Sequence, residues 1–138
     1  MFSILEKKVL APRIKSIKVY APLIAKKFKP GQFVILRLCE EGERIPLTIV
    51  DADKDSIILI FQEVGKTTMM LGKLEVGDTI LDLVGPLGNP SEIKRFGNVC
   101  CVGGGVGIIA LYPITRALRD AGNKITTIIG ARSKDLLI

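Results

Sequence analysis

Four glycines stand within five residues in the last third of the chain, in the run Gly103-Gly104-Gly105-Val106-Gly107. An apolar, β-branched segment precedes this run and an amphipathic segment follows it. A strand, a glycine-rich turn and a helix in this order present backbone N–H groups to the phosphates of a dinucleotide. Gly103 and Gly105 take the first two glycine positions of the dinucleotide-binding pattern, but Ile108 stands at the third. Because every glycine costs backbone entropy on folding, the run favours phosphate binding over a turn that binds nothing.

A second run, Gly65-Lys66-Thr67-Thr68, has the residue types of a helix start that holds a phosphate. It offers N–H groups, one lysine and two hydroxyls. Its first three residues match the end of a phosphate loop of nucleoside triphosphatases, but that motif needs a glycine where Ile60 stands. The sequence therefore argues against a nucleoside triphosphatase. A phosphate site and a capped surface helix stay open as interpretations of this run.

A third run, Arg44-Ile45-Pro46-Leu47-Thr48, places one positive charge at the start of a predicted strand, after the polar residues 40–43. Taken alone, it indicates an exposed arginine at a sheet edge. Two phosphate-type segments follow it in the same chain. All three runs together therefore predict one cofactor site.

The composition restricts the source of any chemistry. The 138 residues include no histidine, which removes the usual general base and the Ser-His-Asp triad. The three cysteines, Cys39, Cys100 and Cys101, lack the spacing of a metal knuckle or a disulfide framework. We therefore predict no metal site in this chain, and chemistry that comes from a bound cofactor.

The net charge of +6 comes from scattered lysines and arginines, which are densest at Lys26, Lys27 and Lys29. Such a surface attracts phosphorylated cofactors or an acidic protein partner, and a basic barrel that binds nucleic acid is the alternative interpretation. No apolar run approaches the roughly 20 residues of a membrane span, and no secretory signal peptide is visible after Met1. We expect a cytoplasmic protein with no membrane or nucleic-acid partner.

The remaining pattern predicts two parts. Six strands are expected in the first part, together with a short helix in 65–74, and they favour a small antiparallel barrel. Two prolines and two glycines in 85–90 then end the strand pattern. A strand at 99–102, predicted to be buried on both faces, a helix at 108–121 and a strand at 124–129 follow. The domains are placed at 1–88 and 89–138. The six expected strands are 2–10, 13–20, 32–38, 45–50, 56–61 and 79–84.

The chain resembles the ferredoxin–NADP reductase superfamily. The resemblance rests on four runs that occur in the same order as the motifs of that family: 44–48, 65–68, 85–88 and 103–107. They are most similar to the electron-transfer flavoprotein subunits of sulfide dehydrogenase, NADH-dependent ferredoxin–NADP oxidoreductase, cytochrome-c3 hydrogenase (gamma chain) and dihydroorotate dehydrogenase. The resemblance implies a six-stranded FAD-binding barrel followed by an incomplete Rossmann-like NAD(P)-binding domain. It covers essentially the whole chain.

The resemblance also implies roles for single residues. Arg44 would neutralise a flavin phosphate, and Thr48, the catalytic candidate, would hydrogen-bond near the reactive edge of the isoalloxazine. The usual family pattern is Arg-x-Tyr-Ser/Thr, so Leu47 replaces the stacking tyrosine and Arg44 lies one residue further away. The implied cofactor-binding residues are Arg44, Pro46, Leu47, Thr48, Gly65, Lys66, Thr67 and Thr68 for FAD, and Gly103, Gly104, Gly105, Val106 and Gly107 for NAD(P).

The function implied is hydride transfer from NAD(P)H to FAD, with electrons passed to an iron–sulfur partner subunit. A [2Fe–2S] cluster is expected only in a longer parent protein, because the three cysteines do not match the family's cluster positions. One βαβ unit stands where a dinucleotide domain uses two such halves, so we expect a fragment that is inactive alone. A structural subunit with vestigial cofactor sites is the further alternative. Arg132 slightly favours NADP, while Asp135 weakens that inference.

Overall fold

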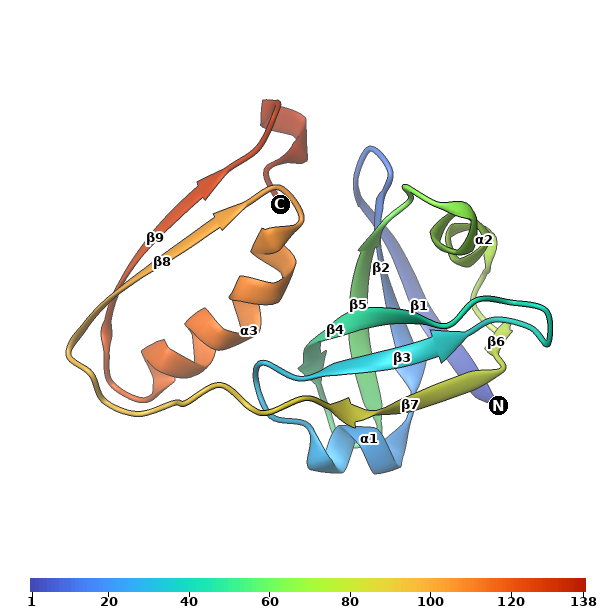
Figure 1. Ribbon diagram of the computed structural model, residues 1–138, viewed down its shortest axis with the longest axis horizontal. Helices are drawn as coiled ribbons and strands as arrows, with labels where there is room; N and C mark the ends of the chain where they lie inside the picture. Colours follow the sequence, from blue (N-terminus) through green and yellow to red (C-terminus); the bar gives the residue numbers. More distant parts are fainter.

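The computed structural model describes residues 1–138 as two parts joined by an irregular segment (Figure 1). The first part is one antiparallel sheet of seven strands in the order β6-β1-β2-β5-β4-β3-β7. The second is a parallel pair, β8 and β9, connected through α3. The strands of the first part are β1 (Phe2–Ala11), β2 (Ile14–Tyr20), β3 (Phe33–Arg37), β4 (Ile45–Ala52), β5 (Ser56–Gln62), β6 (Thr79–Ile80) and β7 (Asp82–Leu87).

The sheet is nearly closed into a barrel by the segment 79–87. Ile80 of β6 pairs with Phe2 at one edge of the sheet, and Asp82 of β7 pairs with Arg37 at the other. The strand predicted at 79–84 is therefore divided at Leu81. Because the segment pairs with one edge of the sheet before Leu81 and with the other edge after it, its backbone N–H and C=O groups must change direction at Leu81. The sheet consequently has seven strands where six were predicted.

Fifteen buried residues fill the interior of the barrel. Inward-facing side chains alternate along the strands, as Ile17 and Val19 do on β2, which is the pattern of a sheet with one buried face. Two helices add to this core. Helix α1 (Pro22–Lys27), which the sequence analysis missed, buries Ile24 and Ala25. Helix α2 (Lys66–Lys73) confirms the predicted short helix and buries Leu71.

In the second part, β8 (Asn98–Gly104), α3 (Gly107–Asp120) and β9 (Lys124–Gly130) form a parallel βαβ unit. The helix runs unbroken through Pro113. On β8, Cys101 is buried, whereas Cys100 and Val102 are exposed. The prediction that the strand at 99–102 is buried on both faces is therefore wrong. α3 covers only one face of the two-stranded sheet.

Asn123 holds the segment between the two parts. Its side-chain oxygen accepts hydrogen bonds from the N–H groups of Phe96 and Gly97, at 2.6 and 2.9 Å. Its amide nitrogen donates to the carbonyls of Lys94 and Leu118. The approach to β8 is thus fixed against the end of α3. None of the helices is long and apolar enough to cross a membrane.

Candidate cofactor site

The site begins where β4 and β5 separate. Their pairing runs from Ala52 and Ile57 to Ile49 and Leu59 and stops there. Beyond that point β4 pairs with β3 and β5 pairs with β2. A strand whose neighbour has left has free backbone N–H and C=O groups on that side. The divergence therefore opens a gap that is lined by polar backbone edges as well as by side chains.

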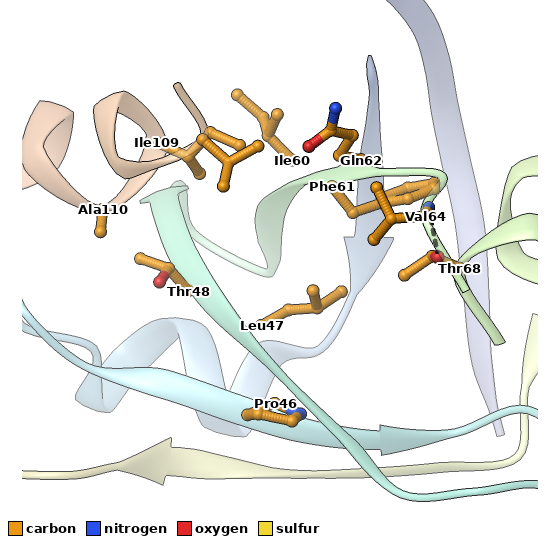
Figure 2. Close-up of a pocket in the computed structure, with 11 residues that line it drawn as sticks. Pro46, Leu47, Thr48, Ile60, Phe61, Gln62, Val64, Thr68, Ile109 and Ala110 are labelled. Carbon is orange, nitrogen blue, oxygen red and sulfur yellow. Dashed lines mark hydrogen bonds between the residues drawn. The ribbon is translucent and has the colours of Figure 1, made fainter. Parts of the chain in front are cut away.

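A cavity of about 260 Å³ occupies this gap (Figure 2). Residues of β4 line one side and residues of β5 the other, while α3 and the turn before α2 stand at its two ends. Its volume lies just below the roughly 300–1,000 Å³ of ligand pockets, which suits a ring system better than a whole dinucleotide. The lining residues are Pro46, Leu47, Thr48, Ile60, Phe61, Gln62, Val64, Thr68, Val106, Ile109 and Ala110.

Five of these lining residues were predicted from the sequence: Pro46, Leu47, Thr48, Thr68 and Val106. They come from three segments far apart in the chain, so the fold brings together the runs at 44–48, 65–68 and 103–107. Sequence reasoning missed the rest of the wall. The available signal was the apolar end of β5 directly before Gly65. The missed residues are Ile60, Phe61, Gln62, Val64, Ile109 and Ala110.

The turn before α2 is held by Thr68. Its hydroxyl oxygen accepts hydrogen bonds from the N–H groups of Val64 and Gly65, at 3.1 and 3.0 Å, and the hydroxyl donates to the Gly65 carbonyl at 3.1 Å. Below the turn, the Lys15 ammonium contacts the Glu63 carboxylate at 3.0 Å and donates to the Gly72 carbonyl. The turn is therefore anchored, while the N–H groups of the first helical turn have no acceptor within the helix.

Thr67 connects α2 to the loop before β4. Its hydroxyl donates to the Glu43 carboxylate at 3.0 Å, and the residue is buried. This hydrogen bond ties the loop that carries Arg44, the next residue after Glu43, to the start of α2, which carries Lys66. Thr67 thus positions the loop that carries Arg44, whereas Thr68 lines the cavity itself.

We expect Thr67→Val to lower the free energy of unfolding by about 1 kcal/mol, because it removes one part-buried hydrogen bond and hardly changes the volume of the side chain. Urea unfolding followed by circular dichroism measures this. Thr126→Val, at an exposed position of β9, is the matched control and should change stability by less than about 0.5 kcal/mol. Equal stabilities of the two variants would contradict the tethering role.

The glycine run divides into positions of different kinds. A Cβ on Gly103 would lie 2.9 Å from Leu111 Cδ2 and 3.3 Å from Ile108 Cα, so this glycine permits the close approach of β8 to α3. Gly105 has φ +55°, a conformation that glycine adopts without strain. A Cβ at Gly104 or Gly107 would meet nothing within 4 Å. Packing therefore explains Gly103 but not Gly104 or Gly107.

A second cavity, of about 290 Å³, adjoins the first through three shared residues, Gln62, Val64 and Val106. Gly105 and the exposed Arg132 also line it. Arg44, Lys66 and Arg132 take part in none of the salt bridges. Three uncompensated cations thus stand on the segments that border the two cavities. No group of three His, Cys, Asp or Glu side chains could hold a metal ion.

No family model matches the chain. A curated relative from Thermotoga maritima, a dihydroorotate dehydrogenase B (NAD⁺) electron transfer subunit homolog, is 53% identical over 137 residues, which are 98% of this chain and 49% of the relative. The solved structure of an NADH-dependent reduced ferredoxin–NADP oxidoreductase, described for flavin-based electron bifurcation, matches with a TM-score of 0.96. That match is 51% identical and covers 100% of this chain and 51% of the other. Over essentially its whole length, this chain is therefore similar to one half of these electron-transfer proteins.

A more distant solved structure shares the fold. Phthalate dioxygenase reductase matches with a TM-score of 0.83 at 17% identity, over 98% of this chain and 44% of that one. The nearly closed barrel therefore has the fold of the ferredoxin reductase-like structures. The chain spans about half the length of the curated relatives that it matches.

Proposed function

We propose that this chain is the FAD-binding part of an NAD(P)H-dependent electron-transfer subunit, with a barrel at 1–88 and the beginning of a Rossmann-like nucleotide domain at 89–138. One observation carries the proposal. Thr48 of the barrel and Val106 of the glycine run line the same cavity. A flavin and a nicotinamide nucleotide bound at these two segments would meet there, as hydride transfer between them requires.

The chain offers the flavin ring a largely aliphatic wall and polar backbone edges. Leu47 lines the cavity at the position where the superfamily pattern has a tyrosine, so the ring would rest on a branched side chain rather than on an aromatic one. Thr48 is half-buried and lines the cavity, and its hydroxyl would hydrogen-bond the ring. The free backbone groups of β4 supply further donors and acceptors for the heteroaromatic edge.

The phosphates of the FAD would lie at the α2 end of the cavity. Arg44 and Lys66 are unpaired cations there, and the start of α2 presents N–H groups that favour an anion. Gly65 is exposed, and a Cβ at this position would meet nothing within 4 Å. The turn therefore leaves its backbone open to a ligand. These features fit a pyrophosphate group.

The nicotinamide nucleotide would lie over the second cavity. Gly104, Gly105 and Gly107 leave the backbone before α3 open, and Arg132 stands beside it as a cation. A bound flavin accepts a hydride and releases electrons one at a time to an iron–sulfur partner. The chain's own contribution is to hold two ligands on facing walls and to exclude water with aliphatic side chains. Arg132 slightly favours a 2′-phosphate, and hence NADP, while Asp135 three residues later weakens that preference.

We expect Arg44→Ala to weaken FAD binding about tenfold, because it removes one charge-assisted interaction with a phosphate. Titration of the purified chain with FAD, followed by flavin fluorescence and visible absorbance, measures the dissociation constant. Arg119→Ala is the matched control. It removes the same charge from an exposed position on α3 whose only partner is Asp120, and it should leave the constant unchanged.

Two results of this titration would overturn the proposal. Equal weakening by both variants would indicate attraction by net charge rather than a site. A colourless chain that ignores FAD, alone and within its longer parent protein, would favour a subunit without a working cofactor site. A separate binding measurement addresses the basic-barrel alternative. Affinity for nucleic acid that falls steeply with salt concentration would favour it.

A further inference from the structure

The orientation of the two parts is not fixed by their backbones. The barrel and the β8–β9 pair are separate sheets, joined along the chain by the irregular segment 88–97. No backbone hydrogen bond runs between residues 1–87 and residues 98–138. The main contact between the parts is instead made by α3, which lies against β4. Arg132, Leu136 and Ile138 of the C-terminal segment also line cavities together with barrel residues. Side chains on α3 therefore make the largest contribution to how the glycine run is held over the cavity.

The first contact of α3 with the barrel is apolar and incompletely filled. Ile108 and Ile109 face Val50 and Ile60 across a cavity of about 200 Å³. Leu10 and Tyr112 line the same cavity. Dispersion contacts are lost wherever a gap separates two surfaces. This contact therefore places the start of the helix without fixing the direction of its axis.

The second contact is directional. The Arg116 guanidinium donates two hydrogen bonds to the Asp51 carboxylate, with Nη2–Oδ1 at 2.6 Å and Nη1–Oδ2 at 3.0 Å. Both side chains are about one-third exposed. It is the only salt bridge between α3 and the barrel. A bidentate arginine–carboxylate pair constrains angle as well as distance.

Two points on one helix determine its axis. Ile109 and Arg116 are seven residues apart, or about 10 Å along the helix. Tyr112 lies one turn before Arg116, and its ring centre is 5.4 Å from the guanidinium carbon. This stacking orients the guanidinium on the helix surface. On the barrel side, Asp51 lies three residues beyond Thr48 on β4. The ion pair therefore joins α3 directly to the strand that lines the cavity.

We propose that Asp51 and Arg116 are a positioning pair, which sets the angle between the barrel and the βαβ unit and thereby holds Val106 and Ala110 over the cavity. Neither residue lines that cavity. The purpose of the angle, alignment of a nicotinamide with a flavin, rests on the proposed function. The angle itself depends only on the contacts described.

The pair stays charged over the physiological pH range. The hydrogen bonds from Arg116, above all, lower the pKa of the Asp51 carboxyl below its ordinary value. A carboxyl whose folded-state pKa is lowered contributes stability above its unfolded pKa and loses it as the pH falls through the folded value. The same hydrogen bonds raise the pKa of Arg116. The contact should therefore hold at neutral pH and fail only in acid.

The test is a distance measurement between spin labels on the two parts. One label is placed at Glu41→Cys in the exposed β3–β4 loop and the other at the exposed Cys100 of β8, in a background carrying Cys39→Ser and Cys101→Ala. The labelled parent should give one narrow distance distribution by double electron–electron resonance. Asp51→Ala and Arg116→Ala should each at least double its width. The charge-reversed double variant, Asp51→Arg with Arg116→Asp, should restore most of the narrowness.

Arg119→Asp is the matched control on the same helix, and it should leave the distribution unchanged. Circular dichroism melts of every variant separate loss of positioning from loss of folding. A narrow, unshifted distribution in folded Asp51→Ala would overturn the proposal, as would a double variant that stays as broad as the single variants. The measurement needs no cofactor. A chain that fails to bind FAD but shows these distances would therefore refute the proposed function alone.

Discussion

Uptake of FAD is expected to fall about 10- to 100-fold when Ala110 is replaced by tryptophan. Ala110 lies in the first turns of α3, where it is exposed and lines the cavity between β4 and β5. An indole at this position fills space that a flavin ring needs, and it does not have to enter the buried core. The free energy of unfolding should therefore change by less than about 0.5 kcal/mol. Flavin fluorescence titration gives the affinity, and urea unfolding gives the stability.

Ala110→Ser is the control, since it alters the polarity of the side chain and hardly its volume. It should bind FAD within about threefold of the parent chain. Normal FAD uptake by the tryptophan variant would show that the cofactor occupies another place. A tryptophan variant that unfolds would be replaced by Ala110→Leu, which fills less of the cavity and should give a smaller loss in the same direction.

Position 110 was not among the residues that the sequence pointed to, and the reason is geometric. The runs at 44–48, 65–68 and 103–107 could be recognised because each carries a charge, hydroxyls or glycines. Ile60, Ile109 and Ala110 are ordinary apolar residues. They become a cavity wall only because β4 stops pairing with β5 at Ile49 and Leu59. Where two strands part is decided by the closure of the whole barrel, and no local pattern records it.

The fold shows the same division between local and long-range information. Alternating apolar residues and turn signals predicted most strands of the barrel and both elements that flank the glycine run. The break at Leu81 was not predicted, because it depends on which edges the segment joins. Helix α1 was missed because it has only six residues, too few for a periodic pattern to show. The exposure of Cys100 and Val102 depends on the single covering helix, which the strand's own residues do not reveal.

The pair formed by Asp51 and Arg116 is an extreme case. Its members are separated by 65 positions in the chain, and each has the sequence context of an ordinary surface charge. Asp51 directly follows the strand predicted at 45–50, and Arg116 lies within the helix predicted at 108–121. Only the packing of α3 against β4 turns the two into one contact. Interactions that relate two structural parts are those that sequence patterns predict least well.

The second prediction with a large expected effect concerns the glycine run. Two substitutions in this run distinguish a glycine needed for packing from a glycine needed for ligand binding. We expect Gly103→Val to speed amide hydrogen exchange in β8 and β9 about 10- to 100-fold, because its side chain must displace Leu111 and press on the backbone of Ile108. Gly104→Ala should leave exchange within about twofold of the parent, since its Cβ meets nothing within 4 Å. It should instead weaken NAD(P)H binding about tenfold, by placing a methyl group where a pyrophosphate would approach the backbone.

The two variants thus make opposite predictions for two measurements on neighbouring residues. Hydrogen exchange followed by mass spectrometry reports the first, and quenching of NAD(P)H fluorescence reports the second in a protein long enough to bind the nucleotide. If Gly104→Ala binds the nucleotide normally, the run is a structural turn, and ligand binding does not explain its excess of glycines. If Gly103→Val exchanges as slowly as the parent, the close approach of β8 to α3 is not what requires that glycine. Either outcome would reassign a position that the sequence pattern treats as equivalent to its neighbour.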